Sequence, residues 1–170
     1  MLLHTTRLII REFTLADAAF IVELLNEPGF LQYIGDKGVR DIAGAEQYLR
    51  EGPLASYARH GFGLCAVTLT DGTPLGMCGL LKRDFLEHPD LGYAFLARHN
   101  GQGYAFEAAS AVMRHAQAEL HLTTLHAITA FRNPASVNLL TKLGFDFVKF
   151  FEQPGYTEPS RLFTWQVPAP

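Results

Sequence analysis

The chain has 170 residues, of which 48% are apolar and 18% charged, so we expect one folded domain over residues 1–170 rather than a disordered segment. Its net charge of −3, without any run of Lys or Arg, argues against nucleic acid as a partner. No apolar run is long enough for a membrane span, and the first residues lack the pattern of a secretory signal, so we expect a cytoplasmic protein without a membrane partner.

The first third of the chain is predicted to form one strand and two helices. Residues 7–13 read as a strand, and residues 14–29 begin with a capping pattern and continue with apolar positions at helical spacing. A second helix is expected at about residues 41–58, interrupted at 52–53, whereas residues 30–34 form an apolar segment of unassigned type. The irregular pattern of this region suits contacts with a substrate more than core packing.

Two β-rich runs, residues 62–70 and 74–82, flank an Asp-Gly pair at 71–72, which is a strong signal for a β-hairpin. With a two-residue loop, Cys65 faces Cys78 on the neighbouring strand. This pairing would allow a disulfide, but two reduced cysteines in a packed sheet are the expected state. A loop longer by one residue is expected to remove the pairing altogether.

The second half of the chain alternates strands with helices. Strands are predicted at residues 90–96, 124–130, 145–151 and 161–167, with helices at 104–121 and 133–143. The resulting order, β-α-α-β-β-β-α-β-α-β-β, predicts an α/β (α+β) fold with a mixed, mostly antiparallel sheet of about seven strands and helices on both faces. The crossover through the central helix should be right-handed and make its two flanking strands parallel.

The turn before the central helix contains two glycines, in the pattern Arg98-x-x-Gly101-x-Gly103. A strand that stops there and restarts as a helix presents unpaired backbone N–H groups and the positive end of the helix dipole, which suit a phosphate or diphosphate. Glycine permits positive φ and lets an anion approach the main chain. The spacing differs from the Walker loop and from the three-glycine dinucleotide fingerprint. An ordinary strand-to-helix turn without a ligand is the alternative.

This pattern resembles the acyl-CoA loop of the GCN5-related N-acetyltransferases (GNAT), which reads Gln/Arg-x-x-Gly-x-Gly/Ala. Residues 133–145 are similar to a second segment of the same family, Asn-x-x-Ser-x-x-x-x-x-Lys-x-Gly-Phe. Residues 91–108 and 5–11 resemble the RimJ/RimL-like branch, which acetylates ribosomal-protein N-termini. Two motifs in the family's order, separated by a helix and a strand, are more specific than either alone.

The resemblance implies a GNAT-like fold and acetyl transfer from acetyl-CoA to a primary amine, without a metal. The strand before the turn would hydrogen-bond the pantetheine arm, and the backbone N–H groups of the turn would hold the pyrophosphate. Asn133 would contact the CoA arm, and Asn138 or Lys142 its nucleotide end, although Lys142 is equally well explained as a solvated charge. The cofactor-binding residues expected from the resemblance are Phe95, Leu96, Ala97, Arg98, Gly101, Gln102, Gly103, Tyr104, Ala105, Asn133, Asn138 and Lys142.

Acetyl transfer needs a base for the amine proton and a group that serves the departing thiolate. In many relatives a Tyr serves the thiolate, but Leu140 occupies that position here, and Ser136 is the nearest replacement. The alternative role of Ser136 is hydrogen bonding at the helix N-terminus. The two candidates for the base are Asp90, acting through a water, and His88, whose side-chain type titrates near neutrality; an exposed turn position is the alternative for both. Glu107 is expected to stabilise the helix dipole.

Three functions compete for this chain. The leading one is an N-acetyltransferase that acts on a protein or peptide N-terminal α-amine by direct attack on the thioester. The alternatives are acetylation of a small amine, such as an antibiotic or a polyamine, and a non-catalytic acyl-CoA-binding protein, which the missing Tyr at position 140 slightly favours. The mildly acidic net charge does not decide among them, and the sequence leaves open whether the protein is a homodimer.

Overall fold

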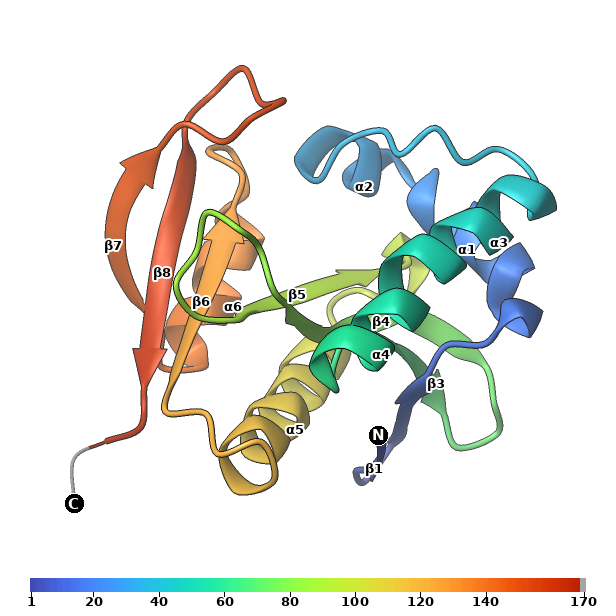
Figure 1. Ribbon diagram of the computed structural model, residues 1–170, viewed down its shortest axis with the longest axis horizontal. Helices are drawn as coiled ribbons and strands as arrows, with labels where there is room; N and C mark the ends of the chain where they lie inside the picture. Colours follow the sequence, from blue (N-terminus) through green and yellow to red (C-terminus); the bar gives the residue numbers. More distant parts are fainter. Residues whose placement is uncertain (169–170) are drawn as a thin grey trace.

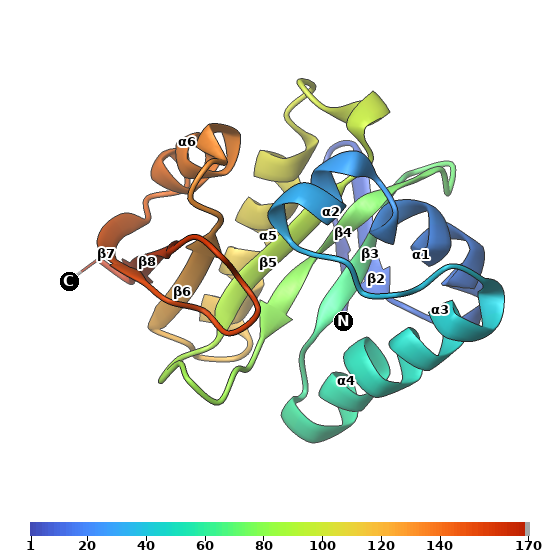
Figure 2. The same cartoon turned by 90° about the horizontal axis from the view of Figure 1, so that it is seen from above.

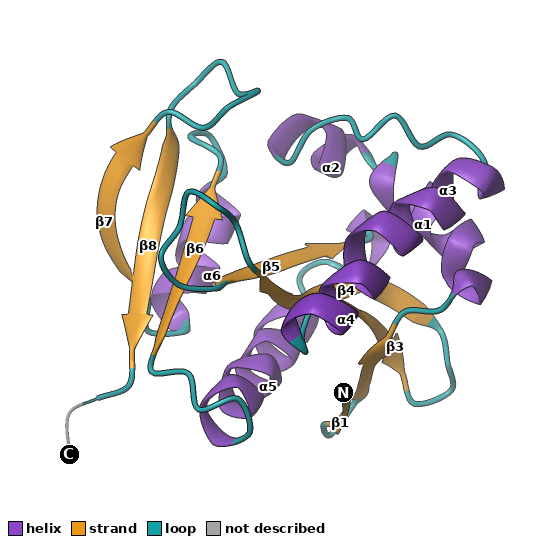
Figure 3. Ribbon diagram, viewed as in Figure 1, coloured by secondary structure: helices purple, strands orange, loops and turns teal. Residues whose placement is uncertain are grey.

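The computed structural model describes residues 1–168, and within them eight strands form one mixed sheet in the order β1-β2-β3-β4-β5-β6-β8-β7 (Figure 1). Helices lie on both faces of this sheet (Figure 3), and none of the described helices is long and apolar enough to cross a membrane. The strands are β1 (Leu2–His4), β2 (Leu8–Glu12), β3 (Leu64–Leu69), β4 (Pro74–Leu81), β5 (Asp90–Phe95), β6 (Thr124–Thr129), β7 (Asp146–Phe151) and β8 (Ser160–Gln166). The α-helices are α1 (Ala18–Leu25), α2 (Pro28–Tyr33), α3 (Ile42–Leu49), α4 (Ala55–His60), α5 (Tyr104–Ala118) and α6 (Pro134–Lys142).

The expected fold, a mixed and mostly antiparallel sheet with helices on both faces, is confirmed, with one strand more than the seven anticipated. The additional strand is β1, which pairs antiparallel with β2 and places Leu3 opposite Ile10. A strand of three residues is too short for an alternation of polarity to identify it. β5 and β6 are parallel, as expected for strands joined by a crossover through α5.

Two apolar clusters pack between the sheet and its helices. Figure 2 shows α5 and the helices α1 and α3 around the sheet. α5 buries Ala108, Val112 and Ala116 against one face, because its apolar side chains recur every three to four residues. α1 and α3 cover the other face, where Leu24 and Leu49 are fully buried. Each fully buried Leu stabilises the fold by about 1.5–3 kcal/mol. α5 therefore packs on one face of the sheet, and α1 and α3 pack on the other.

The helical region between α1 and β3 differs from the expectation at two prolines. The first helix is expected to end near Pro28, but α1 ends at Leu25 and Pro28 is the first residue of α2. The first turn of a helix tolerates a residue without an N–H. Pro53 does not separate two helices, since a π-helical segment, Arg50–Leu54, contains it and joins α3 to α4. The expected interruption is therefore a local change of helix type within one continuous helical run.

The β3–β4 hairpin places Cys65 opposite Cys78, as expected, but by a different route. The N–H of Leu69 donates to the carbonyl of Thr73, so the loop has three residues instead of two. The register then shifts by one residue where Leu75 forms a bulge, and this shift restores the pairing of the cysteines. Both thiols are free and buried. The expectation that a longer loop would remove the pairing is therefore wrong.

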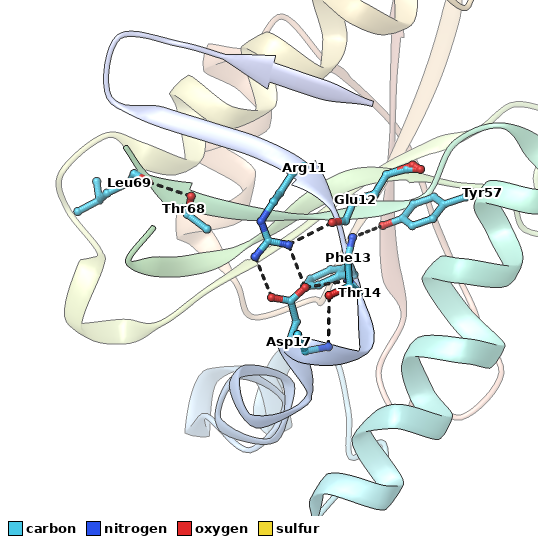
Figure 4. Close-up of polar contacts among 9 residues, drawn as sticks. Arg11, Glu12, Phe13, Thr14, Asp17, Tyr57, Thr68 and Leu69 are labelled. Atoms are coloured by element: carbon cyan, nitrogen blue, oxygen red, sulfur yellow. Dashed lines mark hydrogen bonds and ion pairs between the residues drawn. The ribbon is translucent and has the colours of Figure 1, made fainter. Parts of the chain in front are cut away.

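A polar cluster at the end of β2 ties the helical layer to the sheet (Figure 4). Arg11 donates to both carboxylate oxygens of Asp17, at 2.9 and 2.8 Å, and the N–H of Thr14 donates to the same carboxylate at 2.9 Å. Burial disfavours the charged form of Asp17, but these hydrogen bonds outweigh it and lower the pKa of the carboxyl. The hydroxyl of Tyr57, on α4, accepts from the N–H of Phe13 at 3.0 Å and so fixes α4 beside the sheet.

Candidate functional site

β5 and β6 separate soon after their first residues, which opens the sheet (Figure 1). Within the described residues their one paired position is Asp90 opposite His126, where the N–H of His126 also donates to the carbonyl of Pro89 at 2.9 Å. On its other side, β5 stays paired with β4 as far as Phe95. The edge of β5 that faces β6 is therefore open beyond Asp90, and β5 lines a cleft of about 960 Å³. An open strand edge of this kind can pair with an extended ligand.

The glycine turn lines one end of this cleft. Gly101 and Gly103 have φ angles of 79° and 81°, in the left-handed region that favours glycine, and Gly103 is the N-cap of α5. Within residues 1–168, the backbone N–H groups of residues 101–106 donate to no protein acceptor. The 15-residue helix that follows adds partial positive charge at this end. Free donors and a helix dipole thus meet at the cleft, which suits a diphosphate.

The N-terminal segment holds the glycine turn through an ion pair that links positions about 100 residues apart. Glu107, in the first turn of α5, accepts hydrogen bonds from the Thr5 hydroxyl at 2.6 Å and from the Arg7 Nε at 2.7 Å. Arg7 Nη1 also donates to the carbonyl of Gln102 at 2.8 Å, and the guanidinium lies 4.5 Å from the centre of the Tyr104 ring. Burial opposes ionisation of Glu107, but these contacts outweigh it and lower the pKa of the carboxyl. Glu107 therefore anchors the turn as well as lying at the positive end of the helix dipole.

A pair of hydroxyl groups lines the cleft on the side of α5 and α6. Tyr93, on β5, packs against the apolar cluster of α5, and its hydroxyl is hydrogen-bonded to the Oγ of Ser136, near the start of α6. Burial raises the pKa of Tyr93 to about 12, so its hydroxyl keeps its proton near neutral pH. The cap of α6 is the side chain of Asn133, which accepts from the N–H of Ser136 at 3.2 Å. The Ser136 hydroxyl thus bonds to Tyr93 rather than capping the helix.

Asp90 is the carboxylate at the point where the two strands diverge. It lies three residues before Tyr93, so strand alternation directs the two side chains to opposite faces of the sheet. Asp90 is 1% exposed, lines the cleft, and has the Nε of Arg83 3.1 Å from each of its oxygens. Burial raises the pKa of Asp90 to about 6, although Arg83 opposes the shift. A carboxyl with such a pKa can accept a proton near neutral pH.

Three residues expected in the CoA loop do not line the cleft, because each makes another contact. Leu96 is fully buried, and its N–H donates to the carbonyl of Leu75 at 2.9 Å. Arg98 forms an ion pair with Glu23, and Gln102 is exposed, with its carbonyl used as described above. The expected residues that line the cleft are Phe95, Ala97, Gly101, Gly103, Tyr104, Ala105, Asn133, Lys142, Ser136 and Asp90.

Two further expected residues also lie outside the cleft lining. The ring of His88 lies against that of His126, with 5.4 Å between the ring centres, on the turn before β5. Asn138 is exposed two positions after Ser136, and the turn of the helix between them directs the two side chains to different faces of α6. Of the two candidate bases, Asp90 is the one that the cleft reaches.

The lining of the cleft contains further side chains that the sequence analysis did not identify. Tyr93 could have been found, because alternation along β5 places it on the face opposite Asp90. Lys37, Arg83 and Tyr156 come from three separate loops, so nothing in the local sequence brings them together. The hydroxyl of Tyr156 donates to the carbonyl of Ile34, which joins the β7–β8 loop to the end of α2 (Figure 1).

A family model described as "Acetyltransferase (GNAT) domain" matches residues 7–146. Two proteins of Bacillus subtilis (strain 168) are similar over most of their length. The uncharacterized protein YkkB is 28% identical, over 86% of this chain and 86% of its own. The uncharacterized N-acetyltransferase YnaD is 26% identical, over 90% of this chain and 87% of its own.

Solved structures share the fold at low sequence identity. RimL, a ribosomal L7/L12 α-N-protein acetyltransferase in complex with coenzyme A, is 14% identical, with a TM-score of 0.86 over 98% of each chain. A chimera of the spermidine N-acetyltransferase SpeG from Vibrio cholerae is 16% identical, with a TM-score of 0.78 over 95% of this chain and 96% of its own. The names of these two proteins specify different amines, and at such identities the likeness concerns the fold alone.

Proposed function

Because this chain belongs to the GNAT acetyltransferase family, and so is an acetyl-CoA-dependent N-acetyltransferase, we propose that its acceptor is the α-amine of a protein or peptide N-terminus. This proposal places the chain in the RimJ/RimL-like branch. The fold it shares with RimL supports that placement, although the spermidine enzyme shares the fold too. The observation that carries the proposal is the charge of the cleft, because it distinguishes between the two kinds of acceptor.

The lining of the cleft contains more cations than carboxylates. A polyamine carries several positive charges and would meet repulsion there, whereas a peptide N-terminus brings a single amine that must lose its proton before it attacks. The cationic side chains of the lining are Lys37, Arg59, Lys82, Arg83 and Lys142, and the carboxylates are Glu27, Glu51 and Asp90. Lys142 is assigned to the cosubstrate below, and the other cations still outnumber the carboxylates. The excess of positive charge therefore favours the peptide over the polyamine.

The residues at the glycine turn fit the cosubstrate. The free N–H groups of residues 101–105 would hold its diphosphate, and the open edge of β5 near Phe95 and Ala97 would hydrogen-bond the pantetheine arm. Asn133 and Lys142 would contact its remaining length from α6. When bound, acetyl-CoA supplies the acetyl group as a thioester. Holding the amine beside it contributes on the order of 7–11 kcal/mol to the acceleration in favourable cases.

We propose that the two proton-handling roles lie on opposite sides of β5. Asp90 would take a proton from the acceptor amine, directly or through a water, on the side of α1 to α4. On the side of α5 and α6, the hydrogen-bonded pair of Tyr93 and Ser136 would donate to the sulfur that departs. The Tyr absent from position 140 is thus replaced by a hydroxyl pair, which argues against a non-catalytic binding protein.

The proposal is tested by mixing the protein with acetyl-CoA and a panel of amines and following release of the CoA thiol. The panel contains short peptides with free N-termini, the same peptides with acetylated N-termini, spermidine and an aminoglycoside antibiotic. We expect turnover with the free N-termini alone. Turnover with spermidine or the antibiotic, but not with peptides, would contradict the peptide acceptor. Tight CoA binding without turnover of any amine would contradict an enzymatic role.

A further inference from the structure

The acceptor side of the cleft contains a lysine that pairs with no acidic group among residues 1–168. Lys37 lies between α2 and α3 and lines the cleft, and within residues 1–168 its ammonium makes no ion pair or hydrogen bond. Partial desolvation of the Lys37 ammonium lowers its pKa, and the positive charge of Arg83 lowers it further. Much of the residue is nevertheless exposed to solvent. An anion bound beside Lys37 would offset both effects, because it would replace the missing counter-charge.

Arg83 presents a second cationic group to the same space. Its Nε faces both oxygens of Asp90 at 3.1 Å, and within the described residues its two terminal nitrogens donate to no acceptor. A guanidinium held through one nitrogen keeps its other donors for a planar oxyanion, which it can bind through two parallel hydrogen bonds. Asp90 therefore fixes the orientation of Arg83 without using its full capacity to bind anions.

Among the carboxylates of the cleft, Asp90 pairs with Arg83, and none pairs with Lys37 within the described residues. Asp90 accepts hydrogen bonds from Nε of Arg83 but not from its two terminal nitrogens. Glu51 accepts a hydrogen bond from Gln47, one turn earlier on the same helical run. The charge of Glu27 acts on Arg98, which lies next to the glycine turn. The β7–β8 loop also lines the cleft, and the hydroxyl of Tyr156 joins this loop to the end of α2. Two cations with free donors thus line the same cleft, and one of them, Arg83, contacts the candidate base.

From this arrangement we infer that the acceptor is an amine that also carries a carboxylate, and that Lys37 and Arg83 bind this carboxylate while the amine faces Asp90. The inference rests on the acetyltransferase activity within the proposed function, because it concerns the acceptor of the same site, and it applies to a peptide and to a free amino acid alike. The carboxylate belongs either to an acidic side chain near a peptide N-terminus or to the α-carboxylate of a free amino acid. In both cases Lys37 determines specificity, since it contacts the acceptor away from the reacting nitrogen.

The test uses acceptors in matched pairs. The C-terminally amidated peptides Ala-Glu-Ala-Ala and Ala-Gln-Ala-Ala differ in one side-chain carboxylate. Alanine and alaninamide differ in the α-carboxylate, which also raises the pKa of the amine, so the rates of this pair are compared per concentration of unprotonated amine. We measure kcat/KM for each from thiol release at saturating acetyl-CoA. The carboxylate member of one or both pairs should be preferred by about tenfold, mainly through KM, as expected for one charge-assisted contact. Equal values within both pairs would overturn the inference.

Two variants assign the preference to Lys37. Lys37→Gln should reduce the preference for the carboxylate member to about twofold or less, with the change appearing in KM for that member. Lys37→Glu should shift the preference toward Ala-Lys-Ala-Ala. Lys149→Gln, on the exposed strand β7, is the matched control and should keep the full preference. Thermal unfolding and the KM for acetyl-CoA verify that each variant is folded. A full preference in Lys37→Gln would overturn the role of this residue.

The same data separate this inference from the proposed function. Turnover of peptides without a preference for the carboxylate overturns the inference and leaves the peptide acceptor in place. Turnover of alanine, but of no peptide, supports the inference and overturns the peptide acceptor. Turnover of spermidine alone overturns both.

Discussion

The two ends of the cleft are built from different parts of the protein. At the glycine turn, the groups that face the cleft are backbone N–H groups at the start of a long helix, and Arg7 and Glu107 hold that turn from outside. At the acceptor end, the groups are side chains carried by loops, among them Lys37 and Arg83. A diphosphate is the same in every acetyl-CoA molecule, so a backbone site suits it, whereas loop side chains can change with the acceptor.

This contrast predicts that the glycine turn tolerates substitution least. Gly103→Trp should weaken CoA binding by at least about 100-fold, because a side chain must adopt a φ of 81° and its Cβ would lie 3.4 Å from Nη2 of Arg7, the residue that holds the turn. Isothermal titration with CoA measures the effect. Gly72→Trp, at a φ of 91° in the open β3–β4 turn, carries the same backbone strain and should bind CoA normally. Equal losses in both variants would mean that strain, and not the site, is responsible.

The carboxylate between the two ends should control the dependence on pH. Asp90 accepts a proton only when ionised, and burial raises its pKa to about 6, so kcat/KM should rise with pH and level off above about pH 6. Titration of the acceptor amine would appear separately, near pH 8. Asp90→Asn should lower turnover by about 100-fold and remove the step near pH 6. Asp146→Asn, at the exposed start of β7, is the control, and a step that persists in Asp90→Asn would assign it to another group.

The hydroxyl pair belongs to the cosubstrate side and should affect turnover more than binding. Ser136→Ala and Tyr93→Phe should each lower kcat by about 10–100-fold, because each breaks the hydrogen bond that orients the donor to the sulfur. The double variant should be little worse than either single one, as for groups that act together. Rates measured with saturating acetyl-CoA test this directly. Unchanged rates in both single variants, with normal unfolding temperatures, would remove the pair from the reaction.

The ion pair behind the glycine turn should have the smallest effect and the most selective one. Arg7→Met removes a partly exposed pair, which costs at most about 1 kcal/mol of stability, but it releases the carbonyl of Gln102. We expect the KM for acetyl-CoA to rise by roughly tenfold, with no change for an acetyl thioester that lacks the diphosphate. Arg50→Met, which removes a helix-surface pair with Glu46, is the control. Equal losses with both thioesters would indicate a general loss of structure.

The same contrast explains what the sequence could predict. The fold and the glycine turn follow from local signals, namely periodicity, turn residues and the two glycines whose positive φ the structure confirms. Arg98 lies within the glycine pattern, yet its guanidinium pairs with Glu23, because a spacing rule specifies the backbone and not the direction of each side chain. Lys37 and Tyr156 could not be predicted, because tertiary packing alone brings their loops to one cleft.

The measurement that tests the central claim most directly is a crystal structure of this protein with CoA bound. The account predicts that oxygens of the diphosphate lie within hydrogen-bond distance of the backbone nitrogens of residues 101–105, with the pantetheine arm beside the open edge of β5. A diphosphate bound elsewhere, or amides of the turn already bonded to protein acceptors, would contradict it.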